Sequence, residues 1–192
     1  MVDNGGWTIN GVAASTYGIT LRYSPGIPML PETRDRTAEI PGRNGAYWFD
    51  SDVGQRQFSL PCMFADCADA AALDTLIKTF GRVLVDVNGK PKALSLIFDD
   101  APTITYTVRY AGEIPFDRAW CGMPEFSLNL VADDPFGYEA EDTTDGTITT
   151  SGAGIAVASS GNVTTPAQVS IQNNGETPVD GFTITIQYPK ED

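Results

Sequence analysis

Two pairs of adjacent carboxylates are the residues of this chain that most resemble catalytic groups. Asp99-Asp100 and Asp133-Asp134 could supply the two carboxylates that glycoside hydrolysis places across a sugar. Adjacent residues of a strand point to opposite sides, however, and each pair lies beside a proline in a turn-forming context. Turn formation therefore explains both pairs, and neither has the spacing of a calcium-binding loop. We predict no catalytic and no metal-binding residues here.

Histidine is absent from all 192 residues. The chain thus lacks the commonest general base and the commonest metal ligand, which excludes Ser-His triads, Cys-His pairs and most zinc chemistry. Three cysteines, Cys62, Cys67 and Cys121, show neither zinc-ribbon nor redox spacing, so we expect reduced thiols. The segment 42–45 is not followed by the lysine and helix of a phosphate-binding loop. Together these features predict a protein that is not an enzyme and needs no cofactor.

The net charge is -13, from 25 acidic and 12 basic residues. Such a balance argues against a surface that grips nucleic-acid phosphates, although solubility alone also explains it. Four basic residues gather in one stretch of sequence: Arg34, Arg36, Arg43 and Arg56. Acidic residues intervene among them: Asp35, Glu39, Asp50 and Asp52. Mixed charges of this kind suit contacts between copies of one protein.

These charges lie in a predicted β-hairpin, residues 33–56, whose tip is Ile40-Pro41-Gly42-Arg43-Asn44-Gly45. Pro41 sets φ for a turn, and Gly42 and the Asn44-Gly45 pair accept positive φ. The arms run over residues 34–40 and 46–49, and regular pairing resumes at 56–65. Arms this polar bury little against their own domain, so we expect another surface to cover them.

Three consecutive aromatic residues, Tyr47, Trp48 and Phe49, follow the tip. A strand there must show aromatic surface on both faces. One interpretation is a contact with something outside the domain. The other is that the three rings fold back onto the domain as a satellite core.

The rest of the chain is predicted to be mainly β with one α-helix. Hydrophobic residues make up 42% of the chain and charged residues 19%, and 19 glycines and 13 prolines are spread along it. The predicted strands are residues 7–9, 18–23, 55–65, 82–87, 93–98, 104–114 and 125–132. Turns are predicted at Asn10-Gly11, Asn88-Gly89 and residues 99–102, and Pro61 predicts a strand edge or a bulge.

The predicted helix covers about residues 69–80. Asp66 or Asp69 can cap its N-terminus, and Gly81 is expected to end it. Four apolar residues at helical spacing form one core-facing stripe: Leu73, Leu76, Ile77 and Phe80.

Two regions follow from composition. Residues 1–138 form the first domain, and from residue 139 the chain becomes rich in Thr, Ser, Gly and Asp. Two short strands are expected at 167–171 and 182–188. Large apolar residues are too few in 139–192 for a confident independent core. The start of the chain lacks a signal peptide, and no window is long enough to cross a bilayer, which predicts assembly in a cytoplasm and no membrane partner.

Four stretches, in this order and spacing, resemble the distal tail protein family of long-tailed (siphovirus-type) bacteriophages and prophages. They are Trp7-Thr8-Ile9-Asn10-Gly11-Val12, the tip Ile40 to Gly45, Phe58-Ser59-Leu60 before the single helix, and Phe126 to Tyr138, which ends in Asp134-Pro135-Phe136-Gly137-Tyr138. The resemblance covers residues 1 to about 138.

The resemblance implies a structural virion protein. Members of the family form a hexameric ring at the distal end of the tail, between the tail tube protein and the baseplate hub or receptor-binding proteins. Their N-terminal domain is a β-sandwich with one helix and a projecting hairpin that overlaps the neighbouring subunit. The implied interface residues are Arg34, Arg36, Ile40, Pro41, Gly42, Arg43, Asn44, Gly45, Tyr47, Trp48 and Phe49. DNA is expected to pass through the channel without specific binding, and the acidic excess would keep it from sticking.

In this family the C-terminal domain often resembles a galectin-like jelly roll. The resemblance implies that residues 147–188 are the opening strands of such a fold, so we expect a truncated or reduced jelly-roll-like β segment. An alternative function is a carbohydrate-binding β-sandwich whose exposed aromatic residues stack on sugar rings.

Overall fold

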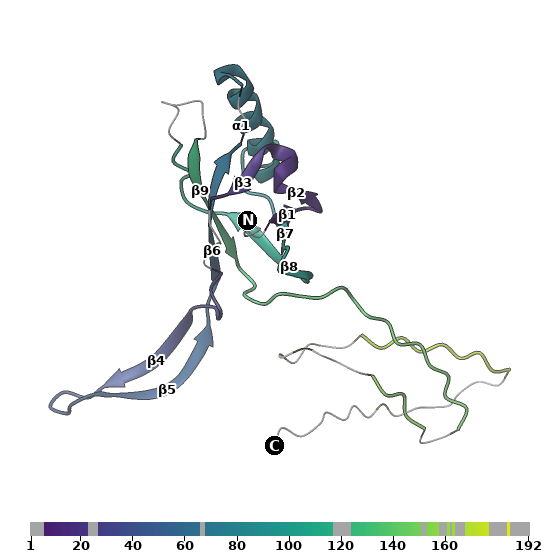
Figure 1. Cartoon of the computed structure of the whole chain (residues 1–192). Helices are drawn as coiled ribbons and strands as arrows, with labels where there is room; N and C mark the ends of the chain where they lie inside the picture. The colour runs from purple at the N-terminus through teal and green to yellow at the C-terminus, as the bar shows by residue number, and fades with distance from the viewer. Residues whose placement is uncertain are drawn as a thin grey trace. The chain divides into compact units, whose positions relative to one another are not determined.

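The structure is a computed structural model that describes residues 6–22, 27–65, 68–116, 124–150, 153–157, 161, 163, 168–176 and 184 (Figure 1). The chain divides into two compact units, Met1–Asp142 and Thr143–Asp192, and each is described by itself. Within the described residues, no helix is long and apolar enough to span a membrane.

The described part of the first unit is mainly β, as predicted. Its elements are β1 (Trp7–Ile9), β2 (Val12–Ala13), the 3-10 helix η1 (Ala14–Tyr17), β3 (Ile19–Leu21), β4 (Thr33–Glu39), β5 (Ala46–Val53), β6 (Arg56–Phe64), α1 (Ala70–Leu84), β7 (Leu94–Phe98), β8 (Ala101–Tyr110) and β9 (Glu125–Ala132). Seven strands form one antiparallel sheet in the order β2-β1-β7-β8-β9-β6-β3. Strands β4 and β5 form a separate two-stranded sheet.

The large sheet curls at β8, which belongs to both of its halves. Ala101 and residues 105–108 of β8 pair with β7, whereas its last two residues, Arg109 and Tyr110, pair with β9. The two halves face each other across a core: the ring of Phe58 on β6 lies 5.7 Å from that of Phe98 on β7 and 5.1 Å from that of Tyr106 on β8. This arrangement is the sandwich-like fold that was predicted.

Strand β6 shows the alternation that builds this core. Its inward residues are buried: Phe58, Leu60, Cys62 and Phe64. Burial raises the pKa of the Cys62 thiol to about 12, so this thiol stays protonated at neutral pH. Of the two alternatives predicted for Pro61, the bulge is wrong, because β6 pairs with β9 without interruption, whereas Pro61 does lie at a local edge, because the pairing of β6 with β3 ends at Cys62. The Pro61 carbonyl accepts from the Arg22 backbone N–H at 2.9 Å, just beyond the end of β3. Proline has no backbone N–H, but β3 has already ended at this point, so no hydrogen bond between β3 and β6 is lost.

Helix α1 packs on this core. The Asp69 carboxylate caps it by accepting from the Ala72 N–H at 2.7 Å, whereas Asp66 lies outside the described residues. Phe80 is buried, and its ring lies 6.4 Å from those of Trp7 and Phe126.

Two predictions at the end of the helix are wrong. Gly81 does not end α1, and residues 82–87 are not a strand, because the helix continues to Leu84. Leu84 is buried in the core, so it extends the apolar stripe of Leu73 and Phe80 by one turn. That burial outweighs the cost of about 1 kcal/mol that a glycine imposes on a helix interior.

The predicted turns are largely confirmed. Asn10 and Gly11 have φ values of 50° and 74° and join β1 to β2. Asn88-Gly89 also forms a turn, but it is flanked by a single bridge between Val85 and Pro91 rather than by two strands. The turn predicted over residues 99–102 is shorter, because β8 already begins at Ala101. The strand predicted at 104–114 accordingly starts earlier, and it ends earlier, at Tyr110.

The end of the first unit packs back onto β8. Tyr138 and Thr105 exchange two backbone hydrogen bonds of 2.8 and 2.9 Å. The Tyr138 hydroxyl donates to the Asp134 carboxylate at 2.7 Å. Gly137 crosses β8 so closely that a Cβ on Gly137 would lie 2.4 Å from the Ile104 Cγ2 and 2.8 Å from the Tyr106 Cε1. The segment after β9 therefore closes the core with a glycine at its tightest contact.

In the described residues of the second unit, no strand or helix is present. The strand predicted at 167–171 is therefore wrong over residues 168–171. The strand predicted at 182–188 lies outside the described residues except for Ile184. Seven of the described β-branched residues of this unit are 43% to 69% exposed: Ile148, Ile155, Val157, Val163, Val169, Ile171 and Ile184. Without a buried face, alternation alone does not produce a sheet.

Two glycine substitutions test this packing in opposite directions. Gly137→Ala should lower the free energy of unfolding by about 1 to 3 kcal/mol, because the new methyl group overpacks against Ile104 and Tyr106. Gly81→Ala is the matched control: a Cβ there meets no atom within 4 Å, so the variant should be more stable by up to about 1 kcal/mol. Urea unfolding followed by circular dichroism measures both, and equal effects of the two substitutions would contradict the described packing at Gly137.

Candidate functional site: the β4–β5 hairpin

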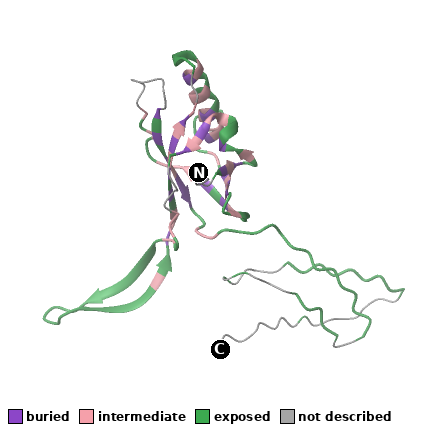
Figure 2. Cartoon of the chain, viewed as in Figure 1, coloured by how far each residue is buried: buried purple, intermediate pink, exposed green. Residues whose placement is uncertain are grey.

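The candidate site is the hairpin formed by β4 and β5. Among the described elements, β4 and β5 pair with each other and with no strand of the large sheet, and the hairpin extends away from that sheet (Figure 1). All residues of β4 are exposed, and so are all residues of β5 except the half-buried Ser51 (Figure 2). The predicted hairpin is present, and it stands clear of the core of its own unit.

The tip has the predicted turn. The Arg43 backbone N–H donates to the Ile40 carbonyl at 3.1 Å. Gly42 and Gly45 have φ values of 85° and 86°, a region that favours glycine, whereas Asn44 does not adopt positive φ. The two glycines therefore supply the positive φ values at which the chain reverses. Pro41 is the second residue of the turn, between Ile40 and Gly42.

A β-bulge interrupts the pairing beside the aromatic residues. Arg36 pairs with Asp50 and Thr37 with Trp48, so Phe49 has no residue opposite it. The bulge lets Trp48 and Ser51, three residues apart, meet on one face: the Trp48 indole N–H donates to the Ser51 Oγ at 3.0 Å. Strict alternation along the strand would separate these two side chains.

The two faces of the hairpin carry different polar contacts. On one face, the Ser51 hydroxyl receives the Trp48 bond and donates to the Asp35 carboxylate at 2.5 Å. On the other face, the Arg36 Nε donates to Asp52 at 3.0 Å in a diagonal ion pair. Both faces are thus internally ordered although solvent surrounds them. Asp35 and Asp52 belong to the mixed charges noted in the sequence, whereas Ser51 is a site residue that the sequence did not point to.

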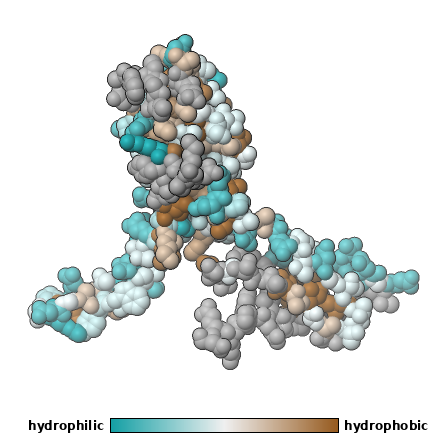
Figure 3. Space-filling model, viewed as in Figure 1, coloured by the Kyte–Doolittle hydropathy of each residue, from teal (hydrophilic) through white to brown (hydrophobic). Residues whose placement is uncertain are grey.

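The aromatic residues stay on the surface of the hairpin. The exposed fractions of Tyr47, Trp48 and Phe49 are 43%, 64% and 69%. The Arg43 guanidinium lies 4.2 Å from the Tyr47 ring centroid, which holds both side chains in place near the tip. The satellite-core interpretation is therefore wrong for this chain. Figure 3 shows mostly hydrophilic and weakly coloured residues along the hairpin, because tyrosine and tryptophan have intermediate hydropathy.

The root of the hairpin is tied to the core by Arg56, the first residue of β6. Its guanidinium lies over the Tyr106 ring, 5.0 Å from the centroid, and donates to the carbonyl groups of Pro28 and Met29. The Gly54 N–H donates to the Glu32 carbonyl at 2.6 Å and closes the base of the two strands. Arg56 thus acts as an anchor of the root rather than as part of a basic patch.

A second polar group at the root involves one of the carboxylate pairs. Asp133 accepts from the Arg109 Nε at 2.8 Å, from the Arg109 Nη2 at 3.0 Å and from the Gln55 amide at 2.5 Å. The hydrogen bond from Arg109 holds the pKa of the Asp133 carboxyl below its usual value. Asp134 instead accepts from Tyr138, so the two neighbouring carboxylates serve different structural contacts.

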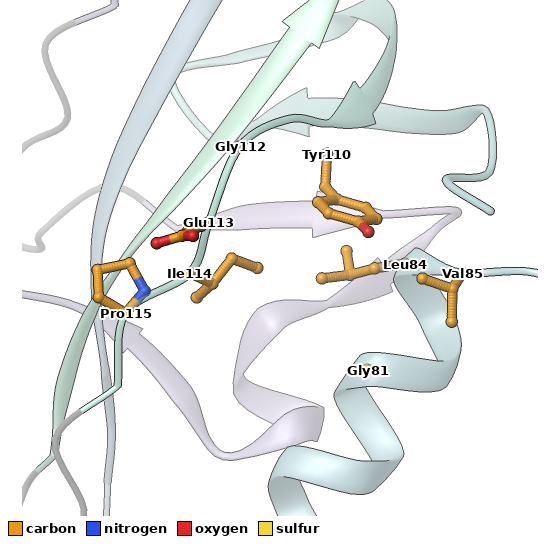
Figure 4. Close-up of a pocket in the computed structure, with 8 residues that line it drawn as sticks. All are labelled: Gly81, Leu84, Val85, Tyr110, Gly112, Glu113, Ile114 and Pro115. Atoms are coloured by element: carbon orange, nitrogen blue, oxygen red, sulfur yellow. The ribbon is translucent and has the colours of Figure 1, made fainter. Parts of the chain in front are cut away.

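The other candidates for chemistry are also structural. Asp99 and Asp100 lie in the turn between β7 and β8. Within the described residues, no group of three or more metal-ligating side chains occurs. A hollow of about 520 Å³ lies between the C-terminal end of α1 and the segment after β8, and Figure 4 shows Leu84, Tyr110 and Ile114 among the side chains that line it. Of the described residues in that lining, Glu113 is the one with a carboxylate. The described lining therefore holds no pair of carboxylates that could act as general acid and general base.

The exposure of the aromatic residues gives a direct prediction. Trp48→Ala should change the free energy of unfolding of the monomer by less than about 1 kcal/mol, because the side chain is mostly in solvent. Phe58→Ala, the buried control on β6, should cost about 3 to 5 kcal/mol. Urea unfolding at low protein concentration compares the two variants, and similar large losses would show that Trp48 belongs to the core after all.

The Asp133–Arg109 pair predicts a dependence on pH. The folded state lowers the pKa of Asp133, so its stabilisation is present above the unfolded-state pKa and is lost as the pH falls through the folded-state value. Both side chains are partly exposed, so Asp133→Asn should cost less than about 1 kcal/mol at pH 7. The difference between wild type and Asp133→Asn should shrink toward zero below the usual aspartate pKa of about 3.9. Parallel urea titrations at both pH values check this, and a difference that grows in acid would contradict it.

Comparisons with known proteins agree with the fold of the first unit. The family described as "Phage tail protein RIFT-related domain" matches residues 13–132, which is more than half of the chain. A search of curated proteins gives no match. Among solved structures, the chain is similar to the Dit protein (gp 19.1) of phage SPP1, described as a paradigm of the hub adsorption apparatus in phages that infect Gram-positive bacteria.

The likeness to the SPP1 protein has a TM-score of 0.61 at 18% sequence identity, and it covers 73% of this chain and 54% of that chain. At this identity it shows the fold alone, and the matched part is about half of the SPP1 protein. Together with the family match, it agrees with the resemblance seen in the sequence. The chain therefore belongs to the phage tail protein RIFT-related domain family, and it has the fold of a siphophage distal tail protein.

Proposed function

We propose that this phage tail structural protein assembles into a hexameric ring at the distal end of the tail, and that the β4–β5 hairpin holds neighbouring subunits together. The observation that carries the proposal is a long hairpin with both faces exposed and three aromatic residues that its own core does not cover. Isolated two-stranded hairpins are marginally stable in water. A partner surface would therefore stabilise the hairpin as well as the assembly.

The composition of the hairpin supports a protein partner. Tryptophan, tyrosine and arginine dominate the binding energy of protein interfaces, and Tyr47, Trp48 and Arg43 lie close together at the tip. The Arg43–Tyr47 contact and the Trp48–Ser51 hydrogen bond restrict these side chains before binding. Pre-ordered side chains lose less conformational entropy when a partner covers them.

The charges support a second copy as that partner. Within β4 and β5, Arg36 pairs with Asp52, and the Asp35 carboxylate accepts from the Ser51 hydroxyl. A surface with both signs of charge can match another surface of the same chain in register. Because the hairpin and the body of the unit are different surfaces, the contact would be heterologous, which generates closed rings when the rotation closes.

Assembly and location follow as parts of the same proposal. The proposed ring joins the tail tube protein to the baseplate hub or to receptor-binding proteins and leaves a channel through which DNA passes without specific binding. A net charge of -13 supports such a channel, because acidic surfaces repel DNA. The protein would be part of the virion tail after assembly in the cytoplasm of the host. Residues 1–138 would form the ring.

The carbohydrate-binding alternative has less support. Sugar-binding sites place aromatic rings in a concave surface with converging polar groups. Tyr47, Trp48 and Phe49 instead follow one another along an exposed strand, and the polar groups beside Trp48 already bond to each other. The family match to phage tail proteins also favours the structural function.

Removal of the hairpin tests the proposal. Replacement of Glu39–Phe49 by a two-residue Asn-Gly turn should abolish the ring while the core stays folded, because the hairpin makes no pairing with the large sheet. Light scattering and native mass measurement over a range of concentrations give the oligomeric state, and thermal unfolding checks the core. Unfolding of the variant would show that the hairpin is part of the core. A ring of unchanged size would show that the hairpin is not part of the interface between subunits.

A further inference from the structure

The connector before β4 carries two apolar side chains that the described part of this unit leaves largely uncovered. Met29 is 90% exposed and Leu30 is 73% exposed. Prolines flank them at positions 28 and 31, and each proline fixes one backbone torsion. The pair is thus a stiff apolar projection at the root of the hairpin, which we call the Met29–Leu30 knob.

Arg56 fixes the backbone of the knob to the core. Its guanidinium donates to the carbonyl groups of Pro28 and Met29 and lies over the rings of Tyr106 and Phe58, 5.0 and 5.6 Å from their centroids. The backbone of an exposed connector is therefore bonded to a side chain that is packed on the core. Such an arrangement presents the two apolar side chains to solvent with little freedom left in the backbone that carries them.

The knob is continuous with the hairpin. Residues 31 and 32 lead directly into β4, and the Glu32 carbonyl accepts from Gly54, where β5 ends. A surface that covers the hairpin from its tip to its root would reach Met29 and Leu30 as well. At the root, the paired residues Arg34 and Asp52 carry charged side chains, whereas the knob supplies large aliphatic groups.

We propose that the Met29–Leu30 knob is a second contact with the neighbouring copy of this chain, beside the hairpin. The inference rests on the proposed ring and deepens it, because it assigns the partner of the knob. Exposed methionine and leucine side chains that become buried in an interface stabilise it through the hydrophobic effect, and their pre-ordered backbone limits the entropy lost.

The test compares Met29→Ser/Leu30→Ser with Val87→Ser. Val87 is 100% exposed near the Asn88-Gly89 turn, so its variant removes an exposed apolar side chain away from the knob. The double variant should raise the concentration at which half of the protein is assembled by about tenfold or more, and Val87→Ser should leave that concentration unchanged. Circular dichroism and thermal unfolding should show both variants folded like wild type, since all three side chains lie in solvent.

A labelling experiment gives an independent measurement. Leu30→Cys, combined with Cys67→Ser and Cys121→Ser, should react rapidly with a maleimide as a monomer and at least about tenfold more slowly in the ring, while the buried Cys62 reacts in neither state. Protection together with weakened assembly of the double variant supports the proposal. A ring that forms with wild-type affinity in the double variant, or in which the thiol introduced at position 30 stays reactive, overturns the knob but leaves the hairpin ring in place. A wild-type protein that never assembles overturns both.

Discussion

The hairpin depends on one half-buried anchor, Arg56. A two-stranded sheet without a covering layer cannot hold its own direction in water, yet β4 and β5 continue through Gly54 and Gln55 into β6, which lies between β9 and β3. Arg56 links the packed core to the exposed hairpin, because its guanidinium stacks on Tyr106 and also donates to the Pro28 carbonyl in the connector that leads into the hairpin. The core thereby sets where an otherwise solvent-exposed arm begins.

The curled sheet supplies the rigid body behind that anchor. Strand β8 pairs with β7 before Arg109 and with β9 at its end, which brings Phe58, Phe98 and Tyr106 into one aromatic cluster. Helix α1 covers another part of the same core through Phe80. The first unit thus combines a packed body with an exposed arm. The proposed contact between subunits rests on that exposed arm.

Local signals predicted much of this arrangement. Alternation gave the correct inward face of β6, and the proline and glycines at positions 41, 42 and 45 predicted the hairpin tip. The failures came where tertiary packing outweighed local preference. Gly81 is a poor helix residue, but burial of Leu84 carries α1 past it, and the alternation of residues 168–171 yields no strand because nothing buries one face.

By itself the sequence determined that the chain is mainly β, that its catalytic chemistry is restricted by the absence of histidine, and that a polar hairpin with three aromatic residues interrupts the fold. These properties follow from composition and from local backbone preferences. Only the tertiary structure decided that the aromatic side chains stay outside the core, that Arg56 anchors the root, and that Met29 and Leu30 project beside it. Exposure is a property of what packs around a residue, and residues far apart in sequence, such as Arg56 and Tyr106, meet only when the sheet has curled.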